Sequence, residues 1–243
     1  MPVEERLNSL DTFISVITRV GHDKRTSAPV RLFRGQSTND PLLPRFAREA
    51  DKRGLSDIVA MERRLLDDFS RLAIPYVGSV RPQNRYEWLA VAQHHGVPTR
   101  LLDWTGNPLF ALWFAVRKKP SGTFGTFWVL HVQENHILPA GIETDVYDLK
   151  RTYVFRPAHI TSRIVAQDGW FTLHWYIQSS NKFVPLEEQP RFKEHLKKYL
   201  IPAEIFTKIR KQLESLGISD AVLFPDLPNL SKELVRRFFP PRP

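Results

Sequence analysis

Apolar residues return every three or four positions over several long stretches of the chain, which is the period of a helix with one buried face. This period predicts helices over residues 3–20, 55–72, 86–95, 191–200, 202–216 and 231–239. A further helix over residues 109–116 is apolar on nearly every side and follows Asn107 and Pro108, a favourable helix start. We therefore expect this helix to lie at the centre of the molecule.

Shorter runs rich in β-branched and aromatic side chains predict strands between these helices. They span residues 30–33, 123–132, 162–165, 170–176 and 221–224. The regular alternation of strand and helix typical of a doubly wound parallel sheet is missing, as are the GxGxxG and P-loop motifs. The prediction is an α+β fold with a modest mixed or antiparallel sheet flanked by helices. Its core is expected to include Trp113, Phe114, Phe127, Trp128 and Leu130.

At 243 residues, of which 42% are hydrophobic, the chain is long and apolar enough to bury a core. We predict an N-terminal helix and loop over residues 1–28, a main domain over residues 29–228, and a C-terminal helix with a proline-rich tail over residues 229–243. No apolar run approaches the length of a membrane span, and the first residues lack the apolar core of a signal peptide. The absence of cysteine excludes disulfides and cysteine-ligated zinc, so a cytoplasmic location is expected.

The chain carries an excess of positive charge, with 35 lysines and arginines against 26 acidic residues and a formal net charge of +9. Such a field raises the local concentration of anions and speeds their encounter with the protein. We therefore expect an anionic partner, either a small ligand such as a dinucleotide or a nucleic acid. The histidines and carboxylates show no spacing typical of a metal site, so no metal is expected. The sequence leaves the oligomeric state open.

The segment over residues 93–105, Gln-His-His-Gly-Val-Pro-Thr-Arg-Leu-Leu-Asp-Trp-Thr, is unusually rich in side chains that bind or react. His94 and His95 fall near the end of a predicted helix, where adjacent residues point about 100° apart, so one site cannot use both. In the extended stretch that follows, Asp103 and Thr105 share one side. Either Asp103 is structural, capping the next helix or pairing with Arg100, or it lines a pocket together with Thr105.

Arg34 ends the predicted strand over residues 30–33 and is followed by Gly35. A guanidinium at this place can donate two parallel hydrogen bonds to a phosphate or a carboxylate, while glycine lets the chain turn away. A surface arginine on an edge strand is the alternative. Further along the chain, Arg163 and His174 stand in apolar strands. Burial there costs free energy unless the polar groups are paired or line a cavity.

Phe33-Arg34-Gly35 and the segment over residues 93–105 resemble the FRG domain family. That family is named for its Phe/Tyr-Arg-Gly motif and shares the Gln-His-x-Gly-x-Pro-Thr-Arg-Leu-Leu-Asp-Trp-Thr block. The resemblance runs over about residues 32–225 and includes an Arg-Ile-x-Ala-Gln-x-Gly-x-Phe-Thr pattern over residues 163–172. A more distant similarity connects the chain with the ADP-ribosyltransferases. Arg34 is similar to the arginine of their first strand, and Thr105 to the leading serine of their second element.

The similarity to ADP-ribosyltransferases implies a cleft that binds NAD. It implies four catalytic residues, which are Arg34, Thr105, Arg163 and Gln167. It implies a cofactor site lined by Arg34, Gly35, Gln36, His95, Thr99, Arg100, Asp103, Phe171 and His174. The chain departs from these enzymes where they carry a glutamate, because Arg163 or Gln167 occupies that position, and a glutamine cannot act as a base.

Three functions are compatible with these features. The first is ADP-ribosyl transfer from NAD to a nucleic acid or a protein, an activity that would suit a toxin or an effector in conflict with phages. The second is a non-catalytic module that binds a nucleotide or a nucleic acid in the same pocket. The third is a hydrolase or nuclease that uses His95 and Asp103.

Overall fold

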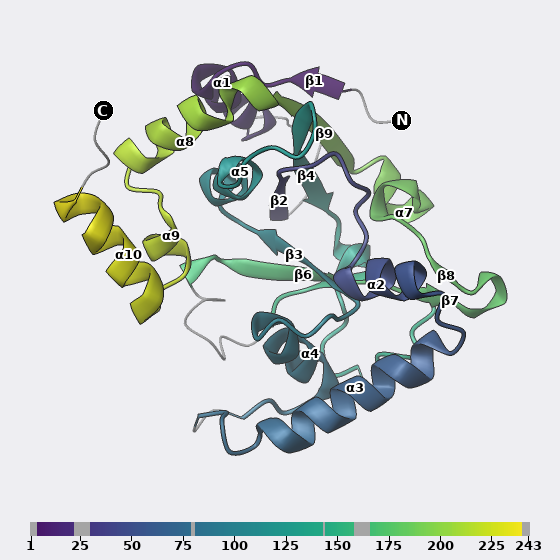
Figure 1. The fold of residues 1–243 in the computed structure, drawn as a ribbon. Helices are drawn as coiled ribbons and strands as arrows, with labels where there is room; N and C mark the ends of the chain where they lie inside the picture. The colour runs from purple at the N-terminus through teal and green to yellow at the C-terminus, as the bar shows by residue number, and fades with distance from the viewer. Residues whose placement is uncertain (1–3, 22–29, 79–80, 143, 158–165, 240–243) are drawn as a thin grey trace.

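The computed structural model describes residues 4–21, 30–78, 81–142, 144–157 and 166–239, and within them a central sheet carries helices on its faces (Figure 1). The strands are β1 (Glu4–Arg6), β2 (Val30–Gln36), β3 (Leu101–Thr105), β4 (Phe124–Val132), β5 (Tyr153–Phe155), β6 (Gly169–Leu173), β7 (Tyr176–Ile177), β8 (Lys182–Phe183) and β9 (Leu196–Pro202). Seven of these described strands form one sheet in the order β1–β9–β4–β2–β3–β6–β5, and β7 pairs with β8 in a separate hairpin. β1 is parallel to β9, whereas every other pair in the sheet is antiparallel. The predicted α+β class with a mixed sheet is confirmed.

The two central strands β2 and β3 separate soon after they meet. β2 pairs with β4 along its whole length, from Val30 opposite Val132 to Gln36 opposite Thr126. With β3 it shares a single registered pair, Phe33 opposite Thr105. The last residues of β2 therefore leave the edge of β3 open to side-chain contacts.

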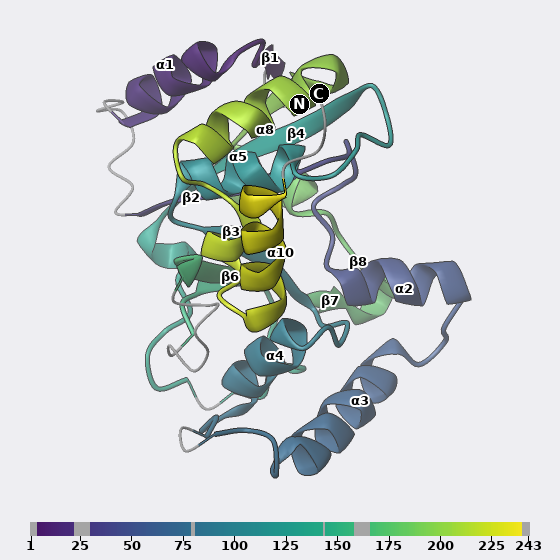
Figure 2. The same cartoon turned by 60° about the vertical axis from the view of Figure 1, so that its left-hand side comes forward.

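Helices cover the sheet at two separate places. The helices of the described residues are α1 (Leu10–Gly21), α2 (Arg45–Arg53), α3 (Ile58–Ala73), α4 (Arg85–His94), α5 (Pro108–Val116), α7 (Pro190–Lys193), α8 (Phe206–Ser215), α9 (Asp220–Leu223) and α10 (Leu227–Phe238). α1, α5 and α8 gather near β9 and β4, while α3 and α4 lie at the opposite end of the molecule, as both views show (Figures 1 and 2). α2 lies beside the β7–β8 hairpin, away from both groups.

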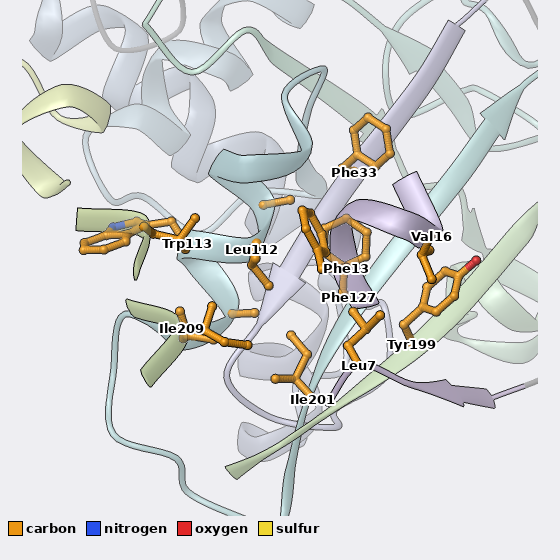
Figure 3. Packing of buried hydrophobic residues seen from close by; sticks show 14 of the residues in the cluster. Leu7, Phe13, Val16, Phe33, Leu112, Trp113, Phe127, Tyr199, Ile201 and Ile209 are labelled. Atoms are coloured by element: carbon orange, nitrogen blue, oxygen red, sulfur yellow. The ribbon is translucent and has the colours of Figure 1, made fainter. Parts of the chain in front are cut away.

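The largest cluster of buried apolar side chains fills the space between α1, α5, α8 and the sheet (Figure 3). Phe127 stands at its centre, with ring centroids 5.1 Å from Phe13 and 5.9 Å from Phe33. The next residue along β4, Trp128, points to the other face of the sheet and belongs to a second cluster. Of the five predicted core residues, Trp113, Phe127, Trp128 and Leu130 are buried, whereas Phe114 is only half-buried.

Two helix ends follow the sequence signals closely. The Asn107 side chain accepts hydrogen bonds from the backbone N–H groups of Leu109 and Phe110, which confirms the predicted start of α5. Gly96 has a φ of 86°, the left-handed conformation expected where α4 ends.

Three expected elements are wrong. Residues 191–200 were expected to form a helix, but α7 stops at Lys193 and the chain continues as β9, because β1 and β4 both supply backbone partners to it. Residues 221–224 were expected to form a strand, but they belong largely to the short helix α9. The opening segment is a strand before it is a helix: β1 pairs with β9, and Leu7 is fully buried in the largest core cluster.

Candidate functional site

A cavity of about 1020 Å³ opens where β2 and β3 separate. The end of β2, the loop after it, α2, β3, α5 and the β7–β8 hairpin all contribute to its wall. Six of the residues predicted from the sequence line it together: Arg34, Gly35, Gln36, Asp103, Thr105 and Gln167. The structure thus brings residues from three distant parts of the chain to one cavity.

Arg34 fills the gap between the two strands. Its Nη1 donates to the backbone oxygen of Asp103 at 2.8 Å, and its Nε donates to Oε1 of Gln36 at 2.9 Å. Nη2 makes no hydrogen bond with any residue in the described part of the chain, and 16% of the side chain is exposed. Burial lowers the pKa of the guanidinium to about 10, with Asp103 raising it and Arg48 lowering it. The group stays protonated at neutral pH, with one edge still able to donate.

Gly35 is required by the helix that crosses β2. A Cβ atom at this position would lie 1.8 Å from the backbone oxygen of Ala111 and 2.7 Å from the backbone nitrogen of Ala115, both in α5. Such distances are far below van der Waals contact, so only glycine lets α5 approach β2 this closely. Although Gly35 lines the cavity, its contact with α5 already accounts for the residue type.

We expect Gly35→Ala to destabilise the protein by about 3 kcal/mol, because α5 must move away from β2 to admit the methyl group. Unfolding in urea measures the change. Gly122→Ala is the matched control, since a Cβ there meets nothing within 4 Å. It should change the free energy of unfolding by less than about 1 kcal/mol. Equal stability of the two variants would contradict the close packing of α5.

Thr105 and Gln167 line the cavity, but both side chains already make hydrogen bonds within the protein. The Thr105 hydroxyl donates to the backbone oxygen of Gln167 at 2.5 Å and accepts from the backbone N–H of Asn107. The Gln167 side-chain amide donates to the backbone oxygen of Leu223 at 2.8 Å. The Thr105 contact ties the end of β3 to the chain just before β6, and the Gln167 amide ties that chain to α9, so both side chains have a structural role.

Asp103 presents its carboxylate to the cavity, with 64% of the side chain exposed. Oδ1 accepts a hydrogen bond of 2.9 Å from Nε2 of Gln93, in α4. Oδ2 lies 4.0 Å from Nη1 of Arg34. Asp103 therefore contacts Arg34 through both its backbone and its side chain, and it neither caps α5 nor pairs with Arg100.

Basic side chains outnumber acidic ones on the cavity wall. Among the described residues the basic ones are Arg34, Arg45, Arg48, Lys52, Arg117, Lys118 and Lys182, and the acidic ones are Asp40, Glu49, Asp51 and Asp103. Two of these arginines also hold the wall together, since Arg45 donates to the backbone oxygen of Gly96 and Arg117 pairs with Asp220. The balance of charge favours an anionic occupant.

Arg100 requires a correction, because the structure gives it a partner far from the cavity. It is 1% exposed and forms a buried ion pair with Glu62 of α3, where Nε donates to both carboxylate oxygens at 3.0 and 2.9 Å. Its Nη1 donates to the backbone oxygen of Val146, and its guanidinium stacks over Tyr147. Arg100 joins α3 to the start of β3 and does not line the cofactor site predicted for it.

Four other predicted cofactor residues also lie outside the cavity. Thr99 and Phe171 are buried, Phe171 among the apolar side chains around α4. His174 is buried, and burial lowers its pKa to about 3, with Arg34 and Arg100 lowering it further. Its Nε2 shares a hydrogen bond of 3.2 Å with the Thr172 hydroxyl. His95 is exposed at the end of α4 and does not line the cavity, and Arg163 lies outside the described residues.

The sequence interpretation missed α2 and the hairpin that faces it. α2 contributes Arg45, Arg48 and Lys52 to the cavity, and the hairpin contributes Lys182. A helix signal was present, since Pro44 precedes the segment and Gly54, with a φ of 59°, ends it. Only Phe46, Ala47 and Ala50 of this helix are buried, which is too few to give a clear apolar period.

The described residues contain no group of three or more His, Asp or Glu side chains arranged to hold a metal ion. In the same part of the chain, no helix combines the length and apolar character needed to cross a bilayer.

Comparison with known proteins gives one result for part of the chain. Residues 30–123 match the family model of the FRG domain. The matched stretch contains Arg34, Gly35 and the whole segment over residues 93–105. It ends before residues 163–172, so the family model does not cover the pattern found there. No curated protein and no solved structure matches the chain at a significant level.

Proposed function

We propose that the cavity binds a nucleotide with a diphosphate group, with NAD as the first candidate, and that Arg34 holds a phosphate. The observation that carries this proposal is the place of Arg34, whose guanidinium is held by two hydrogen bonds at the wall while Nη2 has no protein acceptor among the described residues. A guanidinium fixed in this way can donate to an anion without losing further side-chain entropy.

The size and charge of the cavity support the same ligand class. Sites for small molecules and cofactors have volumes of about 300–1,000 Å³. At about 1020 Å³ the cavity lies just above that range, which suits an extended dinucleotide. The excess of basic side chains on the wall offsets the charge of a diphosphate.

NAD is chosen from the nucleotides because of the similarity of Arg34 and Thr105 to ADP-ribosyltransferase elements. The acceptor of any transfer, a nucleic acid or a protein, and a role as a toxin or phage-conflict effector rest on that similarity alone. A non-catalytic nucleotide- or nucleic-acid-binding module would use the same cavity. A hydrolase built on His95 and Asp103 lacks support, since His95 does not line the cavity.

Substitution of Arg34 tests the proposed binding. Arg34→Lys and Arg34→Ala should both weaken NAD binding by ten- to a hundredfold, about 1.5–3 kcal/mol, because lysine keeps the charge but loses the planar pair of donors. Isothermal titration calorimetry with NAD, ADP-ribose, ATP and a short single-stranded RNA measures the affinities, at a temperature where circular dichroism shows each variant to be folded.

Arg31→Lys is the matched control, since Arg31 is on the same strand and donates to the backbone oxygen of Val20 outside the cavity. It should bind NAD as the wild type does. Unchanged affinity in both Arg34 variants, or no nucleotide binding by the wild type, would contradict the proposal. Binding of RNA alone would instead favour the nucleic-acid module.

A further inference from the structure

We infer that Asp103 is the catalytic carboxylate of the cavity, that it promotes hydrolysis of the bond between ribose and nicotinamide in bound NAD, and that Gln93 is its positioning residue. This inference rests on the proposed function, because it takes the bound nucleotide as its substrate. The proposed function concerns the binding of NAD, and the hydrolysis of NAD is a further step that binding does not require.

A chain of hydrogen bonds fixes the orientation of the Asp103 side chain. The buried Thr99 hydroxyl accepts from the backbone N–H of Leu101 and donates to Oε1 of Gln93. Because Oε1 of Gln93 is occupied as an acceptor, its Nε2 faces Asp103 and donates to Oδ1 at 2.9 Å. An exposed aspartate would otherwise sample several rotamers, so this chain holds one carboxylate oxygen and leaves the other facing the cavity.

Among the described residues, Asp103 is the acidic residue that forms an ion pair with the proposed phosphate anchor. Its backbone oxygen accepts from Arg34, and its Oδ2 lies 4.0 Å from the same guanidinium. The proposal places the ribose of a nucleotide whose phosphate contacts Nη2 of Arg34 beside this carboxylate. The anchor and the carboxylate are held in a fixed relation, which is what positioned catalysis needs.

The other polar groups on the wall are less suited to this step. Thr105 and Gln167 are engaged in bonds within the protein. Among the remaining described carboxylates of the cavity, Asp40 accepts from the Thr38 hydroxyl, and Glu49 pairs with Arg53 one turn further along α2. Asp51 is exposed near the end of α2. None of these three forms an ion pair with Arg34, as Asp103 does.

The proposed step balances with water as the only co-reactant. The bond between C1′ of the ribose and N1 of nicotinamide breaks, and its electron pair stays on N1, which becomes neutral. A water oxygen forms a bond to C1′, and a proton of that water passes to the Asp103 carboxylate and then to solvent. The carboxylate also stabilises the positive charge that develops on the ribose as the bond breaks, as carboxylates do in glycoside hydrolysis.

The rate at which the full chain releases nicotinamide from NAD, measured by chromatography, tests the role of Asp103. Asp103→Asn should lower the rate about 100-fold or more while the Kd for NAD stays within about threefold of the wild type. Gln93→Met keeps the length of the side chain but removes its amide, and it should lower kcat about tenfold with little change in Kd. Formate should restore part of the activity of Asp103→Ala, a rescue that a merely structural role would not show.

Asp68→Asn is the control, because Asp68 has a side-chain exposure of 65%, close to that of Asp103, and pairs with an arginine on the outer face of α3. It should release nicotinamide at the wild-type rate. If the wild type binds NAD but releases no nicotinamide, or if Asp103→Asn is fully active, this inference is overturned while the proposed binding stands. If the wild type binds no NAD, both are overturned.

Discussion

Replacing Glu62 by alanine should destabilise the protein by about 3–5 kcal/mol, the usual cost of leaving one charge of a buried ion pair without its partner. The side chains of Glu62 and Arg100 are only 2% and 1% exposed. Besides the guanidinium, the backbone N–H of Arg100 donates to Oε1 of Glu62 at 3.1 Å. Removal of the carboxylate therefore leaves a buried cation and a buried backbone donor unsatisfied at the start of β3.

Urea unfolding followed by circular dichroism measures this loss. The exposed pair of Asp68 and Arg71 is the control, and Asp68→Asn should cost less than about 1 kcal/mol because solvent screens that pair. Combining Glu62→Leu with Arg100→Met should cost less than Glu62→Ala alone, since no charge stays buried. A Glu62→Ala variant as stable as the wild type would show that the pair contributes nothing.

The sequence predicted most elements correctly where local signals decide them. α5 is one example, because Asn107, Pro108 and an apolar run specify its start and its burial without help from distant residues. β9 is the opposite example. Leu196, Tyr199 and Leu200 fit a helical spacing, but the chain forms a strand because β1 and β4, far away in sequence, flank it on both sides. Pairing between distant segments overrides local propensity there.

The same distinction explains the candidate site. Arg34 and Asp103 could be predicted because both are charged residues within apolar strand segments, which indicates that they pair with another group or line a cavity. Arg100 carried the same signal, yet its partner Glu62 lies 38 positions earlier in α3. Glu62 lies four positions from both Ile58 and Leu66, on the buried face of α3, so the helical period indicates its burial but not its partner. A polar residue in an apolar segment predicts a partner, but the sequence does not say whether the partner is a ligand or another side chain.

The second large effect is expected at the centre of the core. Phe127→Ala should destabilise the protein by about 3–5 kcal/mol, because it removes a fully buried ring from a site that other rings surround. Phe13 packs edge-on against it at 5.1 Å, and Phe33 and Tyr199 lie 5.9 and 6.3 Å away between ring centroids (Figure 3). These neighbours come from α1, β2 and β9, so they cannot fill the space left by the Phe127 ring unless whole elements move.

Thermal unfolding gives the measurement, since a domain of this size loses about 2–4 °C of Tm per kcal/mol. Phe114→Ala is the comparison, because this ring is only half-buried and lines the cavity. Its removal leaves a space that water can enter, and the loss should be less than half of that at Phe127. Similar Tm values for the two variants would mean that the core cluster is not centred on Phe127. A larger loss at Phe127, with NAD affinity changed only in Phe114→Ala, would separate the residue that holds the fold from one that shapes the cavity.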